Sequence, residues 1–124
     1  MILIVDDNNE VRRMIRNLVE DLETDFCECD DGAQALSAYQ ENMPDWVFMD
    51  VQMKEMDGLT ATRQIKESFP KAKVVILTNY SDAKTKKAAI DAGASAFVGK
   101  ENLFALREII IDSDTRSWFK GDKK

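Results

Sequence analysis

The sequence predicts an α/β fold, a doubly wound sheet of five parallel strands with five helices covering its two faces. Short apolar runs alternate with amphipathic segments from one end of the chain to the other, which is the βαβα pattern of a parallel sheet. The length of 124 residues suits one domain and leaves little room for a second. The sequence contains no repeat, no low-complexity stretch and no interdomain linker.

The first half of the chain is predicted to form three strands and two helices. In order, these are a strand over 2–5, a helix over 9–21, a strand over 26–29, a helix over 33–42 and a strand over 46–49. The strands are short apolar runs, and the helices carry apolar residues at helical spacing. Asp7 or Asn8 caps the first helix. Residues 30–32 form the turn and cap before the second helix, and Pro44 ends it.

The second half continues the alternation. In order, it holds a helix over 58–69, a strand over 74–77, a helix over 82–92, a strand over 96–98 and a helix over 102–112. Ser81 is the expected N-cap of the helix at 82, and Gly93 is its expected stop. We therefore expect one domain over 1–112, followed by a mostly polar C-terminal tail over 113–124.

Composition and charge narrow the classes of function. The net charge is −6 and histidine is absent, which argues against a nucleic-acid-binding surface and excludes histidine-based catalysis and metal sites. No apolar run approaches the roughly 20 residues of a membrane span, and no basic and apolar signal segment follows Met1. We expect a cytoplasmic protein that binds neither nucleic acid nor membrane directly.

Cys27 and Cys29 lie two residues apart in the second predicted strand, so both face one side of the sheet. A Cys-x-Cys pair can form a metal or redox site, but the sequence holds no second pair to complete a coordination shell. Two small thiols that face the core are the interpretation we favour.

Polar residues follow four of the predicted strands. Asp6 and Asp7 follow the first strand, Asp50 the third, Thr78 the fourth and Lys100 the fifth. Each has an ordinary explanation by itself, as a helix cap, a turn residue or a surface charge. In an open parallel sheet, however, the carboxyl ends of the strands meet at one edge, where ligand sites are found. Together the residues predict a pocket with three carboxylates, a hydroxyl and an ammonium.

These groups suit phosphoryl transfer to an aspartate. Two carboxylates about 4 Å apart repel by roughly 4 kcal/mol at an effective dielectric near 20, so the pocket needs a cation. Oxygen ligands alone favour Mg²⁺. A metal at Asp7 and Asp50 would draw a donor phosphoryl group onto the remaining Asp50 oxygen. Lys100 and the Thr78 hydroxyl would contact two other phosphoryl oxygens, and the product would be an acyl phosphate.

Further motifs surround these residues. They are Ile-Leu-Ile-Val-Asp-Asp-Asn at 2–8, Asp-Asp-Gly-Ala-Gln-Ala-Leu at 30–36, Pro-Asp-Trp-Val-Phe-Met-Asp-Val-Gln-Met at 44–53, Met-Asp-Gly at 56–58, Val-Val-Ile-Leu-Thr at 74–78 and Gly-Ala-Ser-Ala-Phe-Val-Gly-Lys at 93–100. With these motifs, residues 1 to about 112 resemble the response-regulator receiver domains of two-component signalling. The resemblance implies a flavodoxin-like fold with strand order 2-1-3-4-5.

The resemblance also assigns the chemistry of the site. It implies that a sensor histidine kinase or a phosphotransfer protein phosphorylates Asp50. Mg²⁺ would be bound by Asp7, Asp50 and the backbone carbonyl of Gln52, and Asp6 would reach it mainly through water. Gln52 and Tyr80 would flank the water that hydrolyses the acyl phosphate. Gln52 could orient that water and Tyr80 could cover its approach, or Tyr80 could simply pack on the fourth helix.

Thr78 and Phe97 fall at the switch positions of the resembled family. Phosphorylation adds nearly two negative charges and would shift a pre-existing equilibrium through these two residues. The output surface would be the fourth helix, the fifth strand and the fifth helix. Its partner would be a downstream protein or an effector domain, and a phosphorylation-dependent homodimer is a further form that the resemblance allows.

Three positions depart from the family pattern. Asn79 stands where the family usually has Ala, Ser or Gly, so we expect a tighter phosphoryl pocket. Lys54 replaces a frequent proline, which leaves the loop after the third strand less constrained. Glu101 replaces the frequent proline after Lys100, and the cis bond of the family would cost about 3 kcal/mol there without proline.

Our hypothesis is a phosphorylation-controlled signalling switch that phosphorylates and dephosphorylates itself and is not a turnover enzyme. One alternative is an excised receiver of a larger transcription regulator. Another is a phosphorylation-independent pseudo-receiver, which predicts no Mg²⁺ binding and fits poorly with three intact aspartates. An aspartyl-phosphate hydrolase of the haloacid dehalogenase type is the enzymatic rival. That family has Asp-x-Asp after the first strand, whereas here Asp6 is followed two residues later by Asn8.

Overall fold

The structure, a computed structural model, describes residues 1–23, 25–79 and 82–112. In these ranges five strands alternate with five α-helices. The elements are β1 (Ile2–Val5), α1 (Asn9–Val19), β2 (Phe26–Cys29), α2 (Ala35–Asn42), β3 (Trp46–Asp50), α3 (Gly58–Ser68), β4 (Val74–Thr78), α4 (Ala83–Asp91), β5 (Ala96–Gly99) and α5 (Ala105–Ile111). Two short 3₁₀ turns, η1 (Gly32–Gln34) and η2 (Lys100–Asn102), precede α2 and α5.

The strands form one parallel sheet in the order β2-β1-β3-β4-β5, which confirms the predicted fold and strand order. The register aligns the carboxyl ends of neighbouring strands. Val5 pairs with Met49, and Thr78 pairs with Gly99. The residues that follow these pairs therefore emerge side by side at one edge of the sheet.

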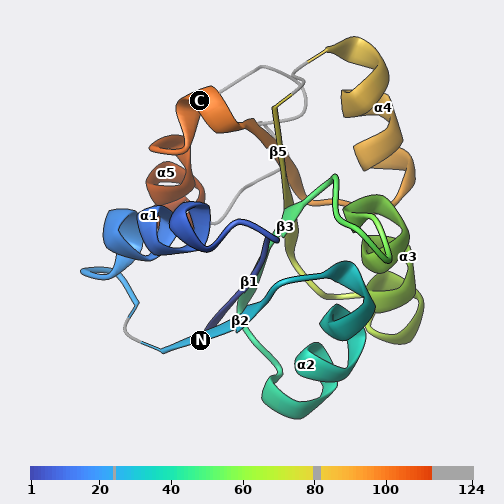
Figure 1. The fold of residues 1–124 in the computed structure, drawn as a ribbon, viewed down its shortest axis with the longest axis horizontal. Helices are drawn as coiled ribbons and strands as arrows, with labels where there is room; N and C mark the ends of the chain where they lie inside the picture. The colour runs from blue at the N-terminus through green and yellow to red at the C-terminus, as the bar shows by residue number, and fades with distance from the viewer. Residues whose placement is uncertain (24, 80–81, 113–124) are drawn as a thin grey trace.

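Helices cover both faces of the sheet. Figure 1 shows α1 and α5 on one side, and α2, α3 and α4 on the other. Side chains alternate between the two sides along each strand. Ile2 and Ile4 pack in the core cluster with α1 and α5, whereas Leu3 and Val5 pack in the cluster with the other three helices. Burial on both faces explains why the strands of this sheet are nearly continuous apolar runs.

The two cysteines belong to the core cluster under α2 and α3, as predicted. Cys29 is buried, Cys27 is partly buried, and both are free thiols. Burial raises the pKa of Cys29 to about 11, so this residue is a neutral thiol at physiological pH.

Polar side chains cap the N-termini of α1 and α4. The side chain of Asn8 accepts hydrogen bonds from the backbone N–H groups of Glu10 and Val11, so Asn8 caps α1. Asp82, rather than the predicted Ser81, caps α4 by accepting from Thr85 N at 2.8 Å. Both residue types are good caps, so the sequence alone could not choose between neighbours. Gly93, with φ +97°, follows the end of α4 as predicted.

Other boundaries differ where a tight turn joins a helix. The predicted helices over 33–42 and 102–112 each start as a 3₁₀ turn and become α-helical only at Ala35 and Ala105. The helices α1 and α4 end at Val19 and Asp91, slightly before the predicted 21 and 92. No described peptide bond is cis, so the bond between Lys100 and Glu101 is trans. No helix in the described ranges is long and apolar enough to cross a membrane.

Candidate functional site

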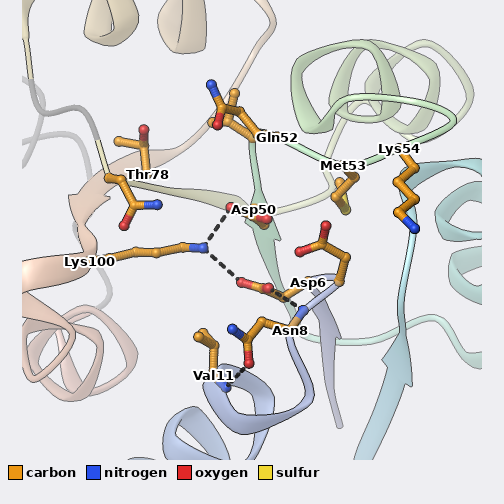
Figure 2. A pocket seen from close by; sticks show the side chains of 12 residues that line it. Asp6, Asn8, Val11, Asp50, Gln52, Met53, Lys54, Thr78 and Lys100 are labelled. Carbon is orange, nitrogen blue, oxygen red and sulfur yellow. Dashed lines mark hydrogen bonds and ion pairs between the residues drawn. The ribbon is translucent and has the colours of Figure 1, made fainter.

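A pocket of about 530 Å³ opens at the carboxyl edge of the sheet (Figure 2). The five residues predicted from the strand ends all line it: Asp6, Asp7, Asp50, Thr78 and Lys100. The geometric part of the prediction is therefore confirmed. Gln52 and Asn79 line the same pocket, both with exposed side chains. Tyr80 lies outside the described residues, so its role in shielding water stays a prediction.

Lys100 is held between two carboxylates. Its Nζ lies 2.8 Å from Asp50 Oδ1 and 3.0 Å from Asp6 Oδ2 (Figure 2). Burial by itself would lower the pKa of Lys100, but its ion pairs with Asp50 and Asp6 outweigh the effect of burial and leave the pKa raised. The side chain is therefore an ammonium at neutral pH. A buried charge of this kind is tolerated only when it is paired.

Asp50 is a buried carboxylate that lies close to the carboxylates of Asp6 and Asp7. Burial raises its pKa, and repulsion from Asp6 and Asp7 raises it further, while the hydrogen bond with Lys100 opposes both. The net shift is upward. One ammonium lies among three clustered carboxylates, so the pocket keeps a net negative charge that favours a further cation.

Asp6 is fully buried, and its two side-chain oxygens have different surroundings. Oδ1 accepts a hydrogen bond from Asn8 N at 2.8 Å (Figure 2). Oδ2 lies near the Lys100 ammonium but not in hydrogen-bonding geometry, and it is a buried oxygen without a hydrogen-bond partner in the described part of the chain. The oxygen is available to a donor that enters the pocket, such as water.

The three aspartates fit a magnesium ion. Asp6, Asp7 and Asp50 each offer one oxygen, and these oxygens all lie within 4.8 Å of one another. Asp7 is exposed, which leaves it accessible to an ion from solution. A set of hard oxygen donors with an unsatisfied acceptor beside it suits Mg²⁺, which keeps several of its waters when bound. The residues present therefore agree with the metal that the sequence predicts.

Asp31, on the turn after β2, holds the loop between β3 and α3. Its Oδ1 accepts from Glu55 N at 2.9 Å, and its Oδ2 accepts from Met56 N at 3.1 Å and from Ala33 N at 2.9 Å. The sequence predicted only a turn and cap at 30–32. It also led us to expect a loosely constrained loop because of Lys54. The structure shows that two hydrogen bonds to the Asp31 side chain restrain the loop from the neighbouring turn.

Two glycines permit close approach of the backbone around Asp50. A Cβ atom at Gly58 would lie 1.8 Å from the carbonyl oxygen of Asp50, so the start of α3 can pass the strand end only with glycine there. Gly58 N also donates to the carbonyl of Val51 at 2.8 Å. At Gly32 a Cβ would lie 2.4 Å from the carbonyl oxygen of Met56. The Asp-Gly pairs at 31–32 and 57–58 were the signals in the sequence for this packing.

The two predicted switch residues lie in different environments. Thr78 is buried and lines the pocket. Phe97 is partly buried on β5, pairs in register with Ile76, and packs against the core cluster under α2, α3 and α4. Phe97 is not among the residues that line the pocket. The structure therefore does not bring Thr78 and Phe97 into one shared pocket.

Comparison with known proteins identifies what this arrangement is similar to. Residues 2–111 match the family model for the response regulator receiver domain. The chemotaxis protein CheY of Bacillus subtilis is 40% identical over 100 residues, which cover 80% of this chain and 83% of that protein. The transcriptional regulatory protein YhcZ of Bacillus subtilis is 37% identical over 103 residues, which cover 81% of this chain but only 48% of YhcZ.

Solved structures agree in fold. A two-component response regulator of the LuxR family from Aurantimonas sp. SI85-9A1 is 29% identical with a TM-score of 0.81, over 98% of this chain and 86% of that one. The CheY in a CheX–CheY–BeF₃–Mg²⁺ complex from Borrelia burgdorferi is 24% identical with a TM-score of 0.79, over 89% of this chain and 87% of that one. At that identity the second likeness concerns the fold alone.

Proposed function

The chain belongs to the response regulator receiver domain family of two-component signalling, and we propose that it is a phosphorylation-controlled switch whose phosphoacceptor is Asp50. The donor would be a sensor histidine kinase or a phosphotransfer protein. The observation that carries the proposal is the position of Lys100 Nζ, 2.8 Å from Asp50 Oδ1 in a pocket that Thr78 also lines.

In the proposed reaction an Asp50 oxygen attacks the phosphorus of the donor. The new bond forms as the bond to the leaving group breaks, and its electron pair departs with that group. Lys100 pairs with one phosphoryl oxygen, and the Thr78 hydroxyl donates to another. Asp7, Asp50 and the carbonyl of Gln52 would hold Mg²⁺, with Asp6 contacting it through water. Bound there, Mg²⁺ neutralises the charge that accumulates during transfer.

The signal would leave through the surface formed by α4, β5 and α5. Thr78 and Phe97 would couple the phosphoryl group to this surface. Large apolar side chains are exposed on it: Ile90 is 46% exposed on α4, Phe104 61% before α5 and Ile111 66% at the end of α5. Such residues support a docking role for a downstream protein, an effector domain or a second copy of the chain. YhcZ, of which this chain covers half, is a transcriptional regulator, which supports the effector-domain alternative.

Intact-mass spectrometry tests the proposal. A small-molecule phosphodonor with Mg²⁺ should add one phosphoryl group, about 80 Da, to the wild type and none to Asp50→Asn. Chelation of the metal should abolish the addition. Equal labelling of the two proteins would contradict the assignment, and steady release of phosphate from a generic ester would favour the hydrolase alternative. Loss of the label over time would report autodephosphorylation, which we expect to be faster in Tyr80→Ala.

A further inference from the structure

Arg12, on the first turn of α1, lies outside the pocket lining but touches the chain that forms it. Its side chain is only 14% exposed. Each of its three guanidinium nitrogens donates a hydrogen bond to a different place: Nε to Glu28 Oε1 on β2 at 2.8 Å, Nη2 to Asn9 Oδ1 at 3.1 Å, and Nη1 to the backbone carbonyl of Asp6. One side chain therefore joins the edge strand, the start of α1 and the end of β1.

The hydrogen bond from Arg12 to the Asp6 carbonyl restrains the backbone that carries Asp7. The carbonyl of Asp6 belongs to the planar peptide that links Asp6 to Asp7, so the direction of this carbonyl sets the plane from which Asp7 projects. Asp6 N already donates to the Cys29 carbonyl at 3.1 Å. Arg12 restrains the other side of Asp6, at the last peptide before the exposed aspartate.

The carboxylate of Asp7 is one of the three oxygen donors of the acidic cluster, but within the described residues no hydrogen bond or ion pair from another side chain holds it. The direction of Asp7 therefore depends on the backbone that carries it. We infer that Arg12 is a positioning residue for the metal site: it fixes the Asp6–Asp7 peptide and thereby orients Asp7 toward Asp50. The inference rests on the proposed Mg²⁺ site.

The positive charge of Arg12 and its hydrogen bond to Asp6 should have opposite effects on Mg²⁺ affinity, which makes the inference testable. The guanidinium is a positive charge near a cation site, so removing its charge alone would tighten Mg²⁺ binding. Removing its hydrogen bond to Asp6 would weaken binding, because the partners that orient metal ligands typically contribute about tenfold or more in affinity. The sign of the change therefore separates the two roles.

Arg16 provides a matched control. Its Nη1 binds the other oxygen of Glu28 at 2.8 Å, so it shares the acidic partner of Arg12. It forms no hydrogen bond or ion pair with Asp6 or Asn9, and its side chain is half exposed. Arg16→Gln removes the same charge from the same helix and leaves the Asp6 carbonyl held. Arg12→Lys keeps the charge but replaces the planar fork, because an ammonium cannot reproduce its three directed bonds.

The experiment is a titration of Mg²⁺ into unphosphorylated protein by isothermal calorimetry, at a temperature where every variant is folded by circular dichroism. We expect the Mg²⁺ Kd to rise about tenfold in Arg12→Gln and to stay raised in Arg12→Lys. It should be unchanged or slightly lower in Arg16→Gln. Phosphorylation by a small donor should recover in Arg12→Gln at saturating Mg²⁺, because the defect lies in metal affinity and not in Asp50.

Three other results would overturn the inference. If Arg12→Gln binds Mg²⁺ as tightly as Arg16→Gln does, Arg12 does not position the site and the inference is wrong. Full recovery of affinity in Arg12→Lys would show that the three directed bonds of the guanidinium are not needed to position the site, which also overturns it. If the wild type binds no Mg²⁺, the proposed function fails first and the inference falls with it.

Discussion

Lys100 Nζ lies 2.8 Å from Asp50 Oδ1, and the same ammonium is 3.0 Å from Asp6 Oδ2. A single cation therefore links the ends of β1 and β3, while Asp7 completes a cluster of three carboxylates. The arrangement holds Asp50, the proposed phosphoacceptor, in place and leaves excess negative charge in the pocket. The following predictions test separate parts of this arrangement.

Asp7→Asn should stabilise the metal-free protein. Folding brings Asp7 close to two other carboxylates, and this repulsion is absent from the unfolded chain. The gain should be about 1 kcal/mol, because Asp7 is exposed and water screens much of the repulsion. Urea denaturation in the presence of a chelator measures the change. The mutant should also lose most of the stabilisation that Mg²⁺ gives the wild type, and a mutant less stable than wild type in chelator would contradict the repulsion argument.

Lys100→Met should destabilise the protein at neutral pH by about 3 kcal/mol, since Asp6 and Asp50 would become buried charges without a partner. Urea denaturation checks this value. Lys54→Met is the matched control, because Lys54 lines the same pocket with an exposed side chain and forms no ion pair with another described residue. Equal stability of the two mutants would mean that Lys100 is not needed to balance the aspartates.

Asp31→Asn should destabilise the protein in a pH-dependent way. Burial alone would raise the pKa of Asp31, but hydrogen bonds from Ala33, Glu55 and Met56 outweigh it, so the pKa is lowered. The folded state thus favours the carboxylate, and this stability is present at neutral pH and lost as the pH falls through the folded pKa. We expect a deficit of about 2 kcal/mol at pH 7 that shrinks below about pH 4.

Urea denaturation across this pH range measures the deficit for Asp31→Asn. Asp30→Asn serves as the control, because the neighbouring Asp30 is exposed. A deficit that is independent of pH would show that the charge of Asp31 does not hold the loop.

Gly58→Ala should lower both stability and phosphorylation. The new Cβ would overlap the Asp50 carbonyl oxygen. Relieving that overlap should lower the free energy of unfolding by about 2 kcal/mol and displace Asp50. Gly93→Ala offers a contrast, because the φ of +97° at Gly93 also disfavours alanine but lies after α4, away from the pocket. Its stability should fall while its labelling by a phosphodonor, measured by intact mass, stays near wild type. Equal labelling of the two mutants would argue against a role for Gly58 in placing Asp50.

The fold could be predicted from the sequence because four of its five strands, β1, β3, β4 and β5, are almost wholly buried. Such strands are short, nearly continuous apolar runs, and helical spacing separates them. The four polar strand ends then located the pocket without any knowledge of tertiary contacts. Even the second strand, with its charged Glu28, kept the predicted limits of Phe26–Cys29.

The supporting contacts could not be predicted in this way. Asp31 reaches a loop 24 and 25 residues further along the chain, and Arg12 bonds to Glu28, 16 residues away. No periodicity in the sequence records which side chains meet across elements. The sequence also could not tell that Asp82 rather than Ser81 caps α4, because both residue types are good caps.

The chemical identity of the modified residue is the decisive observation. Protein treated with a phosphodonor and Mg²⁺ can be reduced with borohydride, which converts an aspartyl phosphate to homoserine, and then mapped by peptide mass spectrometry. We expect homoserine at position 50, and no homoserine in Asp50→Asn or in chelator. Homoserine at Asp6 or Asp7 instead, or a phosphoryl group on a hydroxyl side chain with Asp50 unmodified, would contradict the assignment of Asp50 as the phosphoacceptor.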